Sequence, residues 1–215
     1  MLPYASGMAV WEDHLLPRLI NVLCGSKAIG WHRAQAVVGL SGSVVEIGFG
    51  SGLNVPLYPA EVTTLYAVEP SSVGRKLGAK RLEHSSVPVE FVGLDGQALP
   101  LGSESVDAAL STFTLCTIPD VAQALGELLR VLRPGGRFHF LEHGLAPDPI
   151  VAGRQHRFNG FQGRVAGGCH LDRPIDRLVT DAGFEISTLK NDWIRGPKVL
   201  RPWNYLYVGV ATKPA

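Results

Sequence analysis

Cysteine and long apolar runs are both scarce in this sequence of 215 residues. Its three cysteines, Cys24, Cys116 and Cys169, are odd in number, widely spaced and without a CxxC pair. This arrangement argues against a disulfide framework and against a cysteine-rich zinc site, so no metal is expected. No run of about 18 apolar residues could form a membrane-spanning helix. The N-terminal segment lacks the basic region and long apolar run of a standard signal peptide, and we therefore expect a soluble, cytoplasmic protein.

Net charge is also small, because 20 Lys and Arg side chains face 19 Asp and Glu, which leaves +1 at neutral pH. This balance gives no field that would attract nucleic acid or an anionic membrane. Hydrophobic residues make up 46% and charged residues 18%, which excludes a disordered chain and fits one domain. The residue in excess is glycine, with 25 copies, or about 12% against a usual ~7%. The chain therefore uses many tight turns, or backbone that approaches a ligand closely.

Seven short runs rich in β-branched and aromatic residues predict strands. They cover residues 44–47, 64–69, 87–92, 106–111, 137–141, 184–190 and 205–211. Helix-length segments separate the first five, which is typical of βαβ units and a parallel sheet. The last two runs predict a hairpin.

The helical segments are predicted at residues 71–84, 120–132 and 173–182, and through most of the first 40 residues. Asp120 with Gln123 three residues later resembles a capping box, whereas two glycines weaken the prediction for 71–84. We expect a single domain over 1–215. It consists of a helical cap (1–40), a ligand-binding core (41–145), and a substrate-side segment with the C-terminal hairpin (146–215).

A glycine-rich segment directly follows the first predicted strand, in the stretch Glu46-Ile-Gly48-Phe49-Gly50-Ser-Gly52-Leu-Asn54. Glycines there allow positive φ in a tight turn and let a ligand rest on bare backbone. A nicotinamide-binding fold has a glycine turn at the same point, but with the spacing G-x-G-x-x-G. Here the spacing is G-x-G-x-G, and Glu46 lies two residues before the first glycine. Because that carboxylate would repel a pyrophosphate but not a sulfonium or ammonium, the turn favours a cationic ligand.

Polar groups follow three further predicted strands. Glu69, followed by Pro70, ends the second strand, where a carboxylate can accept hydrogen bonds from ribose hydroxyls. Asp95-Gly96-Gln97 follows the third strand and can hydrogen-bond an adenine amino group, although an ordinary turn has the same sequence. Thr112 and Phe113 follow the fourth strand, at the edge where doubly wound sheets bind their ligands.

The ordered set VVEIGFGSG, AVEP, GLDGQALP, VDAALSTFTLCTIPD and LRVLRPGGRFHFLEHG resembles the class I S-adenosylmethionine-dependent methyltransferases over about residues 40–145. The resemblance implies an α/β fold with a Rossmann-like, doubly wound seven-stranded sheet. This sheet would be mostly parallel, with an antiparallel C-terminal strand and helices on both faces. It also implies that the glycine motif surrounds the methionine part of S-adenosylmethionine, that Glu69 binds the ribose and that Asp95 contacts adenine. Phe49 departs from the family, in which many members carry a small residue or Cys.

These motifs and the strand ends together give the predicted cofactor-binding set. It comprises Glu46, Gly48, Phe49, Gly50, Gly52, Asn54, Glu69, Pro70, Asp95, Gly96, Gln97, Thr112 and Phe113. The cofactor would leave as S-adenosyl-L-homocysteine.

Three C-terminal features point to a branch of the family. The segments FLEH (140–143), GGCHLDRP (167–174) and RPWNYLYVGVA (201–211) resemble the methyltransferase-like thiol S-methyltransferases and their bacterial relatives. The ubiquinone- and menaquinone-biosynthesis methyltransferases share the core motifs and are less well separated. The animal thiol enzymes carry an N-terminal membrane anchor, which we do not expect here.

Methyl transfer from a sulfonium is an in-line displacement, which an enzyme assists mainly by alignment in a dry pocket. A thiol needs little help from a base, since a few per cent is already thiolate at neutral pH. The candidates for a catalytic base are His143, at the end of the fifth strand, then His170, with His156 third. A structural role is at least an equal alternative for each, and for His156 it is the favoured one. Glu142 would either orient the His143 ring or serve as a structural hydrogen-bond acceptor.

The acceptor stays open at this point. A small-molecule thiol or sulfide comes first, with O- or C-methylation of a phenol or quinone, or N-methylation of a phospholipid headgroup, as alternatives. A regulatory module that binds the cofactor without turnover is the non-enzyme alternative. Five arginines between 151 and 177 form either a site for an anionic substrate or, more often, a solvated face. The N-terminal helix would cover the cofactor or substrate, with peripheral membrane contact as the other use. No nucleic acid partner is expected, and monomer and homodimer are both open.

Overall fold

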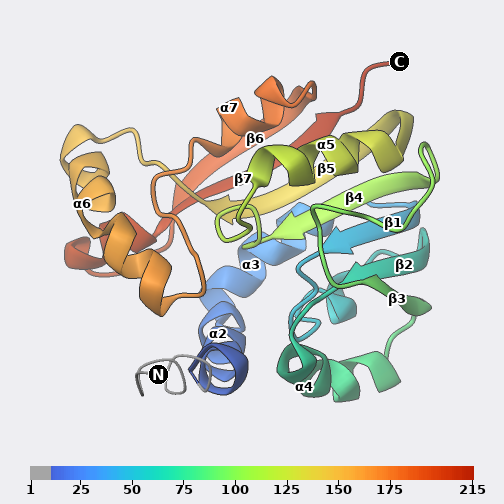
Figure 1. Ribbon diagram of the computed structural model, residues 1–215, viewed down its shortest axis with the longest axis horizontal. Helices are drawn as coiled ribbons and strands as arrows, with labels where there is room; N and C mark the ends of the chain where they lie inside the picture. The colour runs from blue at the N-terminus through green and yellow to red at the C-terminus, as the bar shows by residue number, and fades with distance from the viewer. Residues whose placement is uncertain (1–10) are drawn as a thin grey trace, which may run out of the picture.

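One seven-stranded sheet organises the computed structural model, which describes residues 11–215 (Figure 1). Its strands are β1 (Gly42–Ile47), β2 (Val62–Val68), β3 (Val89–Gly93), β4 (Val106–Thr112), β5 (Leu132–His143), β6 (Glu185–Trp193) and β7 (Tyr205–Thr212). Their order is β3-β2-β1-β4-β5-β7-β6. Only β7 runs antiparallel to its neighbours β5 and β6. The predicted mostly parallel, doubly wound sheet is therefore confirmed.

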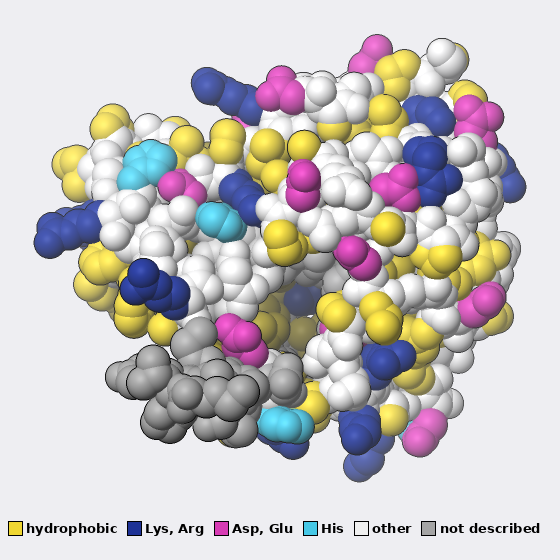
Figure 2. Space-filling model, in the orientation of Figure 1, with side chains coloured by type: hydrophobic (Ala, Val, Ile, Leu, Met, Phe, Trp, Pro, Cys, Tyr) yellow, Lys and Arg dark blue, Asp and Glu magenta, His cyan; other side chains and the backbone are white. Residues whose placement is uncertain are grey.

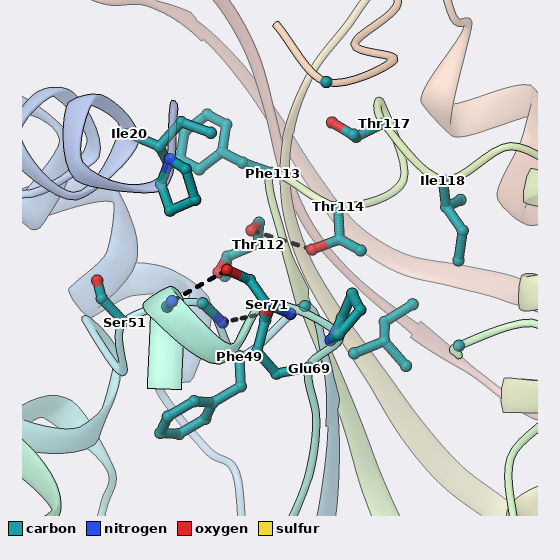
Figure 3. A pocket seen from close by; sticks show the side chains of 18 of the residues that line it. Ile20, Phe49, Ser51, Glu69, Ser71, Thr112, Phe113, Thr114, Thr117 and Ile118 are labelled. Atoms are coloured by element: carbon teal, nitrogen blue, oxygen red, sulfur yellow. Dashed lines mark hydrogen bonds between the residues drawn. The ribbon is translucent and has the colours of Figure 1, made fainter. Parts of the chain in front are cut away.

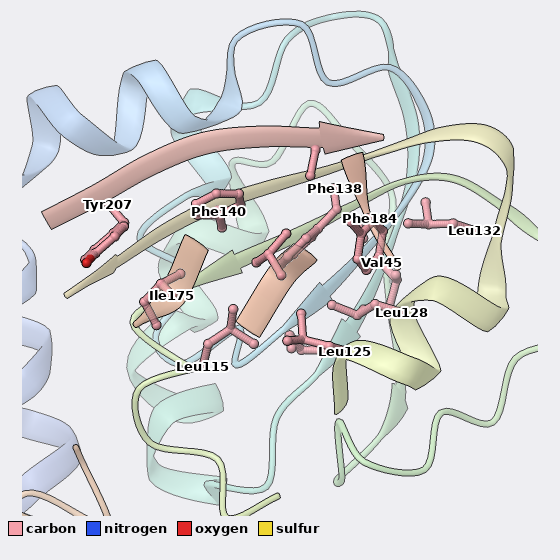
Figure 4. Packing of buried hydrophobic residues seen from close by; sticks show 14 of the residues in the cluster. Val45, Leu115, Leu125, Leu128, Leu132, Phe138, Phe140, Ile175, Phe184 and Tyr207 are labelled. Atoms are coloured by element: carbon pink, nitrogen blue, oxygen red, sulfur yellow. The ribbon is translucent and has the colours of Figure 1, made fainter. Parts of the chain in front are cut away.

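The helical elements cover both faces of this sheet. They are η1 (Trp11–Leu15), α2 (Leu16–Cys24), α3 (Lys27–Val37), η2 (Val55–Leu57), α4 (Ser72–Glu83), α5 (Val121–Val131), α6 (Pro149–Val165), α7 (Ile175–Asp181) and η3 (Lys198–Trp203). Side chains of α5 and α7 pack on one face with Phe138 and Phe140 of β5, as Figure 4 shows. On the opposite face, Val37 and Leu40 pack with Phe49, Val55 and Tyr58. Burial of these apolar side chains is the main force that holds the layers together.

The strand β5 begins five residues earlier than predicted. The sequence predicts a helix over 120–132 and a strand from residue 137, whereas α5 ends at Val131 and β5 includes Pro134, Gly135 and Gly136. The backbone N–H of Gly135 instead donates to Lys213 O over 3.0 Å, and Lys213 N donates to Gly136 O over 2.9 Å. The segment after β7 therefore provides the hydrogen-bond partners that extend β5 over these residues.

The longest helix, α6, was not predicted. Gly153, Gly160 and Gly163 lower the helix propensity of this segment, and its apolar residues do not recur at a clear helical spacing. Its start is nevertheless capped, because the Asp148 side chain accepts a hydrogen bond from Ile150 N over 2.9 Å. Figure 1 shows α6 at the left of the molecule, on the side opposite β3.

Two glycines of α4 have a packing role that the sequence did not reveal. A Cβ at Gly74 would lie 3.0 Å from the carbonyl oxygen of Gly50, and one at Gly78 would lie 3.0 Å from that of Ser51. These glycines let the helix lie directly on the backbone of the glycine-rich turn. The residues that weakened the helix prediction are therefore the ones that position the helix.

Candidate functional site

A cavity of about 440 Å³ opens where the strands of the parallel sheet end. The segments 48–51, 69–71, 94–96 and 112–114 after the first four strands line it, together with α2 and residues 166–168. Figure 3 shows side chains from these segments converging on the cavity, and Figure 2 shows the hollow between hydrophobic surfaces. Doubly wound sheets bind ligands at this edge.

The glycine-rich turn forms one wall of the cavity. Gly48, Gly50 and Gly52 have φ of +72°, +58° and +69°, a region that glycine adopts without strain. A Cβ at Gly48 would in addition overlap the side chain of Thr114. Gly48, Phe49 and Gly50 line the cavity, whereas Gly52 lies behind it, against the Phe49 ring.

Glu69 lies in the cavity wall and already binds two backbone groups. Its Oε2 accepts a hydrogen bond from Gly50 N and its Oε1 accepts one from Ser71 N, both at 2.6 Å (Figure 3). Burial raises the pKa of the carboxyl group, while these two hydrogen bonds lower it. Each carboxylate oxygen has two lone pairs, so both retain a position for a ligand hydroxyl.

Glu46 does not line the cavity. It is 1% exposed, and its carboxylate accepts hydrogen bonds from Asn54 Nδ2 at 2.6 Å and from the Tyr58 hydroxyl. Burial raises its pKa to about 7 against the effect of these hydrogen bonds. Glu46 and Asn54 were predicted to contact the ligand. In the structure they lie outside the cavity lining and hydrogen-bond to each other, which supports the glycine-rich turn.

Arg33 of α3 is a cavity residue that the sequence did not reveal. Its Nη1 donates to Asn54 Oδ1 and to Thr112 Oγ1, both at 2.9 Å, and its Nε donates to Cys24 O at 3.3 Å. The side chain is only 6% exposed yet lines the cavity. No local sequence motif identifies Arg33, because the packing of α3 brings it to the site.

Of the residues predicted on the adenine side of the ligand, three line the cavity and one does not. Pro70, Asp95 and Gly96 line the cavity, whereas Gln97 does not. Gln97 instead caps α5: its Oε1 accepts from Asp120 N at 2.7 Å, and its carbonyl accepts from Gln123 Nε2 at 2.9 Å. The predicted cap is otherwise present, since Asp120 accepts from Gln123 N.

Thr112 and Phe113 both line the cavity at the end of β4. Phe113 has φ of +57°, which is unfavourable for a bulky side chain and is typical of functional sites. Its ring lies beside the Arg33 guanidinium, 5.4 Å from the centroid, and edge-on to His143 at 6.1 Å. Phe113 therefore separates the cavity from His143.

The candidate bases lie outside this lining. His143 Nε2 is 3.1 Å from Cys169 Sγ, and His170 Nδ1 is 3.2 Å from Asn159 Nδ2. His156 is exposed and pairs with Asp172 at 2.8 Å. Glu142 does not orient the His143 ring; it accepts from Ser111 Oγ at 2.7 Å and Thr114 N at 3.0 Å. None of the described residues that line the cavity is a histidine.

Cys116 joins His143 and Cys169 in one buried cluster. A hydrogen bond between the two thiols lowers the pKa of Cys169 and raises that of Cys116. The neighbours Thr117 and Gly168 line the cavity, so the cluster lies directly behind its wall.

The arginines of the 151–177 segment separate into two groups. Arg154, Arg157, Arg164 and Arg177 are exposed. Arg173 is half-buried and donates to the backbone oxygens of Leu115 and Ile118. It therefore ties this segment to the loop after β4.

Comparison with known proteins extends over nearly the whole chain. A family model described as a methyltransferase domain matches residues 45–140. The human thiol S-methyltransferase TMT1A is 31% identical over 217 residues, which cover 92% of this chain and 85% of that protein. The chain belongs to the class I S-adenosylmethionine-dependent methyltransferases. A phosphatidylethanolamine N-methyltransferase of Cereibacter sphaeroides is 26% identical over 67% of the chain and 71% of its own length.

Solved structures agree with this family at the level of the fold. The Haemonchus contortus phospholethanolamine N-methyltransferase 2, in complex with phosphomonomethylethanolamine and S-adenosylhomocysteine, superposes with a TM-score of 0.73 at 15% identity. The match covers 97% of this chain and 60% of that one. The match to the methyltransferase domain model and the 31% identity to TMT1A confirm the predicted S-adenosylmethionine-dependent methyltransferase. No helix in the described part of this methyltransferase is long and apolar enough to cross a membrane.

Proposed function

We propose that this methyltransferase transfers the methyl group of S-adenosylmethionine to the sulfur of a small thiol. The observation that carries the proposal is the 31% identity to a thiol S-methyltransferase over 92% of the chain. The chemistry of the cavity supports it. Its described lining offers no histidine to deprotonate an acceptor, and a thiol needs the least help, since its ordinary pKa is near ~8.5.

The cofactor in this proposal lies along the ends of the first four strands. Glu69 accepts the ribose hydroxyls, Asp95 accepts from the adenine amino group, and the backbone of Gly48–Gly50 contacts the methionine part. The site's residues suit these roles, because the carboxylates of Glu69 and Asp95 and the backbone of the turn all line one cavity.

Arg33 binds the carboxylate of the methionine part. Its Nη2 has no hydrogen-bond partner in the described part of the chain, and the side chain lines the cavity beside Thr112. A guanidinium binds a carboxylate through charge-assisted hydrogen bonds. Arg33→Met should therefore weaken binding of S-adenosylmethionine at least tenfold. Calorimetry with 5′-methylthioadenosine, which lacks the amino-acid part, serves as the control and should change less than twofold.

The acceptor is tested with S-adenosylmethionine labelled in its methyl group. The panel contains alkyl thiols, hydrogen sulfide, phenols, quinols and ethanolamine lipids. We expect labelled thioethers from the thiols and no product from the phenols. Methylation confined to oxygen, carbon or nitrogen acceptors would overturn the assignment.

A further inference from the structure

A compact group of three soft ligands lies behind the cavity wall. The side-chain donor atoms of Cys116, His143 and Cys169 all lie within 4.8 Å of one another. A tetrahedral zinc site with two thiolates and one imidazole needs ligand separations of about 3.5–3.8 Å, as follows from its bond lengths. The observed separations therefore need only small side-chain movements to close around one ion.

The three ligands come from separate elements, and the backbone holds those elements together. Cys116 lies in the loop after β4, His143 ends β5, and Cys169 follows α6. The carbonyl of Cys116 accepts a hydrogen bond from His170 N at 2.7 Å, and Cys116 N donates to Glu142 Oε2 at 3.3 Å. Cys116 is thus held by His170, which follows Cys169, and by Glu142, which precedes His143. These backbone contacts fix the three ligands relative to one another, which is the preorganisation that a metal site requires.

The surroundings of the cluster favour a metal over a free thiolate. Cys116 and Cys169 are 1% and 6% exposed, and Leu115, next to Cys116, and Leu171, two residues after Cys169, are fully buried. A lone charged group in such a place is costly. Two thiolates and a neutral imidazole on a divalent ion give a complex of zero net charge. A zinc ion therefore removes the cost of burying the thiolates.

We propose that Cys116, His143 and Cys169 bind one zinc ion, whose fourth position takes the sulfur of the acceptor thiol. The second part rests on the function proposed above. Catalytic zinc sites use three protein ligands and leave the fourth position for water or substrate. The cluster borders the cavity, because Thr117 and Gly168, the sequence neighbours of Cys116 and Cys169, form part of the cavity wall.

The chemical step balances without a further reactant. The acceptor thiol binds the metal and releases its proton to solvent, since metal ligation requires the thiolate. The sulfur lone pair then forms the S–CH₃ bond while the bond from the methyl group to the cofactor sulfonium breaks. S-adenosylhomocysteine and a neutral thioether are the products. Because a thioether is a weaker ligand than a thiolate, the product leaves the ion.

Cobalt(II) provides a direct test of the metal site. The full chain, reduced with a phosphine and freed of metal with a chelator, is titrated with Co²⁺. We expect one equivalent to bind with thiolate charge-transfer bands and the intense visible bands of tetrahedral cobalt, which Zn²⁺ then displaces. Cys116→Ser, Cys169→Ser and His143→Gln should each lower the affinity for Co²⁺. The loss should exceed the roughly 10–100-fold that follows substitution of residues hydrogen-bonded to metal ligands. Cys24→Ser is the matched control and should bind normally.

Binding of 2-mercaptoethanol tests the fourth position. Its addition to the cobalt protein should increase the charge-transfer absorption, whereas ethylene glycol, which carries hydroxyls only, should not. An unchanged spectrum overturns the role of the fourth position. Absence of stoichiometric metal binding, equal binding by the cysteine variants, or a Cys116–Cys169 disulfide in the reduced, metal-supplemented protein overturns the site itself.

The two proposals fail in different ways. If thiol binds the cobalt protein but no label reaches sulfur, the thiol methyltransferase function is wrong and the metal site stands. If the metal-free protein and Cys169→Ser methylate thiols at the rate of the zinc protein, the function stands and the zinc inference is wrong.

Discussion

The backbone N–H of Gly50 donates to the Glu69 carboxylate over 2.6 Å. This hydrogen bond joins the glycine-rich turn after β1 to the end of β2. It places the carboxylate that we assign to the ribose against the backbone that we assign to the methionine part. Cofactor binding and the conformation of the turn are therefore coupled through one side chain.

Glu69→Gln should weaken S-adenosylmethionine binding at least tenfold, or ~1.4 kcal/mol. The amide keeps the size of the side chain but replaces a charged acceptor by a neutral oxygen and an NH₂ donor. Isothermal calorimetry measures the change. The exposed Glu90 of β3 provides a matched Glu90→Gln control, and equal affinities of the two variants would contradict the ribose assignment.

Glu46→Gln should change how stability depends on pH. Burial raises the pKa of Glu46 to about 7 from an ordinary value of 4.5, so the folded state holds the proton more tightly than the unfolded state. The stabilisation that results from protonated Glu46 is therefore complete below pH 4.5 and is lost as the pH rises through 7. Glutamine does not titrate. Relative to the wild type, the variant should therefore gain about 2–3 kcal/mol between pH 5 and 8. Urea unfolding measures this difference, and a constant value across that range would show that Glu46 does not titrate as described.

Gly48→Ala and Gly50→Ala should differ sharply. Both positions have positive φ, which costs about 1–2 kcal/mol for alanine. At Gly48 the methyl group also overlaps the Thr114 side chain, whereas at Gly50 the nearest atom is 3.9 Å away. We expect Gly50→Ala to fold with that modest loss and Gly48→Ala to lose several kcal/mol more. Thermal and urea unfolding of both proteins would decide this, and similar losses would mean that φ alone governs the turn.

Gly153, Gly160 and Gly163 of α6 should each tolerate alanine. Among the described residues, no atom outside the helix lies within 4 Å of a Cβ at these positions, and alanine is favoured over glycine in a helix by roughly 0.5–1 kcal/mol. Each substitution should raise the free energy of unfolding by about that amount. Gly78→Ala in α4 is the contrasting control, because its Cβ would lie 3.0 Å from Ser51 O. Destabilisation by all four substitutions would contradict the open surroundings of the three α6 glycines.

The sequence predicted the elements whose signals are local. The strand runs, the Asp120 cap and the turn at Gly48–Gly52 each depend on neighbouring residues, and the family motifs placed Glu69 and Asp95 correctly at the strand ends. Arg33 escaped prediction because its partner Thr112 is distant in sequence and meets it only through the packing of α3.

The cysteine cluster escaped for the same reason. Three widely separated ligands form no spacing motif, and Cys116 and Cys169 meet only when the loop after β4 and the segment after α6 are both in place. Wide spacing argued against a cysteine-rich zinc motif, but it carries no information about ligands that the fold brings together.

The position of α3 has a consequence for synthesis of the protein. Ala36 packs with Leu141 of β5 and with Leu206 and Val208 of β7, and its carbonyl accepts from His139 at 2.8 Å. This helix therefore finds its partners in strands that follow it much later in the chain. Since domains generally fold as units, Ala36 gains its β7 partners only after that strand has left the exit tunnel, whereas Val37 and Leu40 pack with the earlier residues Phe49, Val55 and Tyr58. During that interval the Ala36 side of the helix is exposed to chaperones that bind short apolar segments.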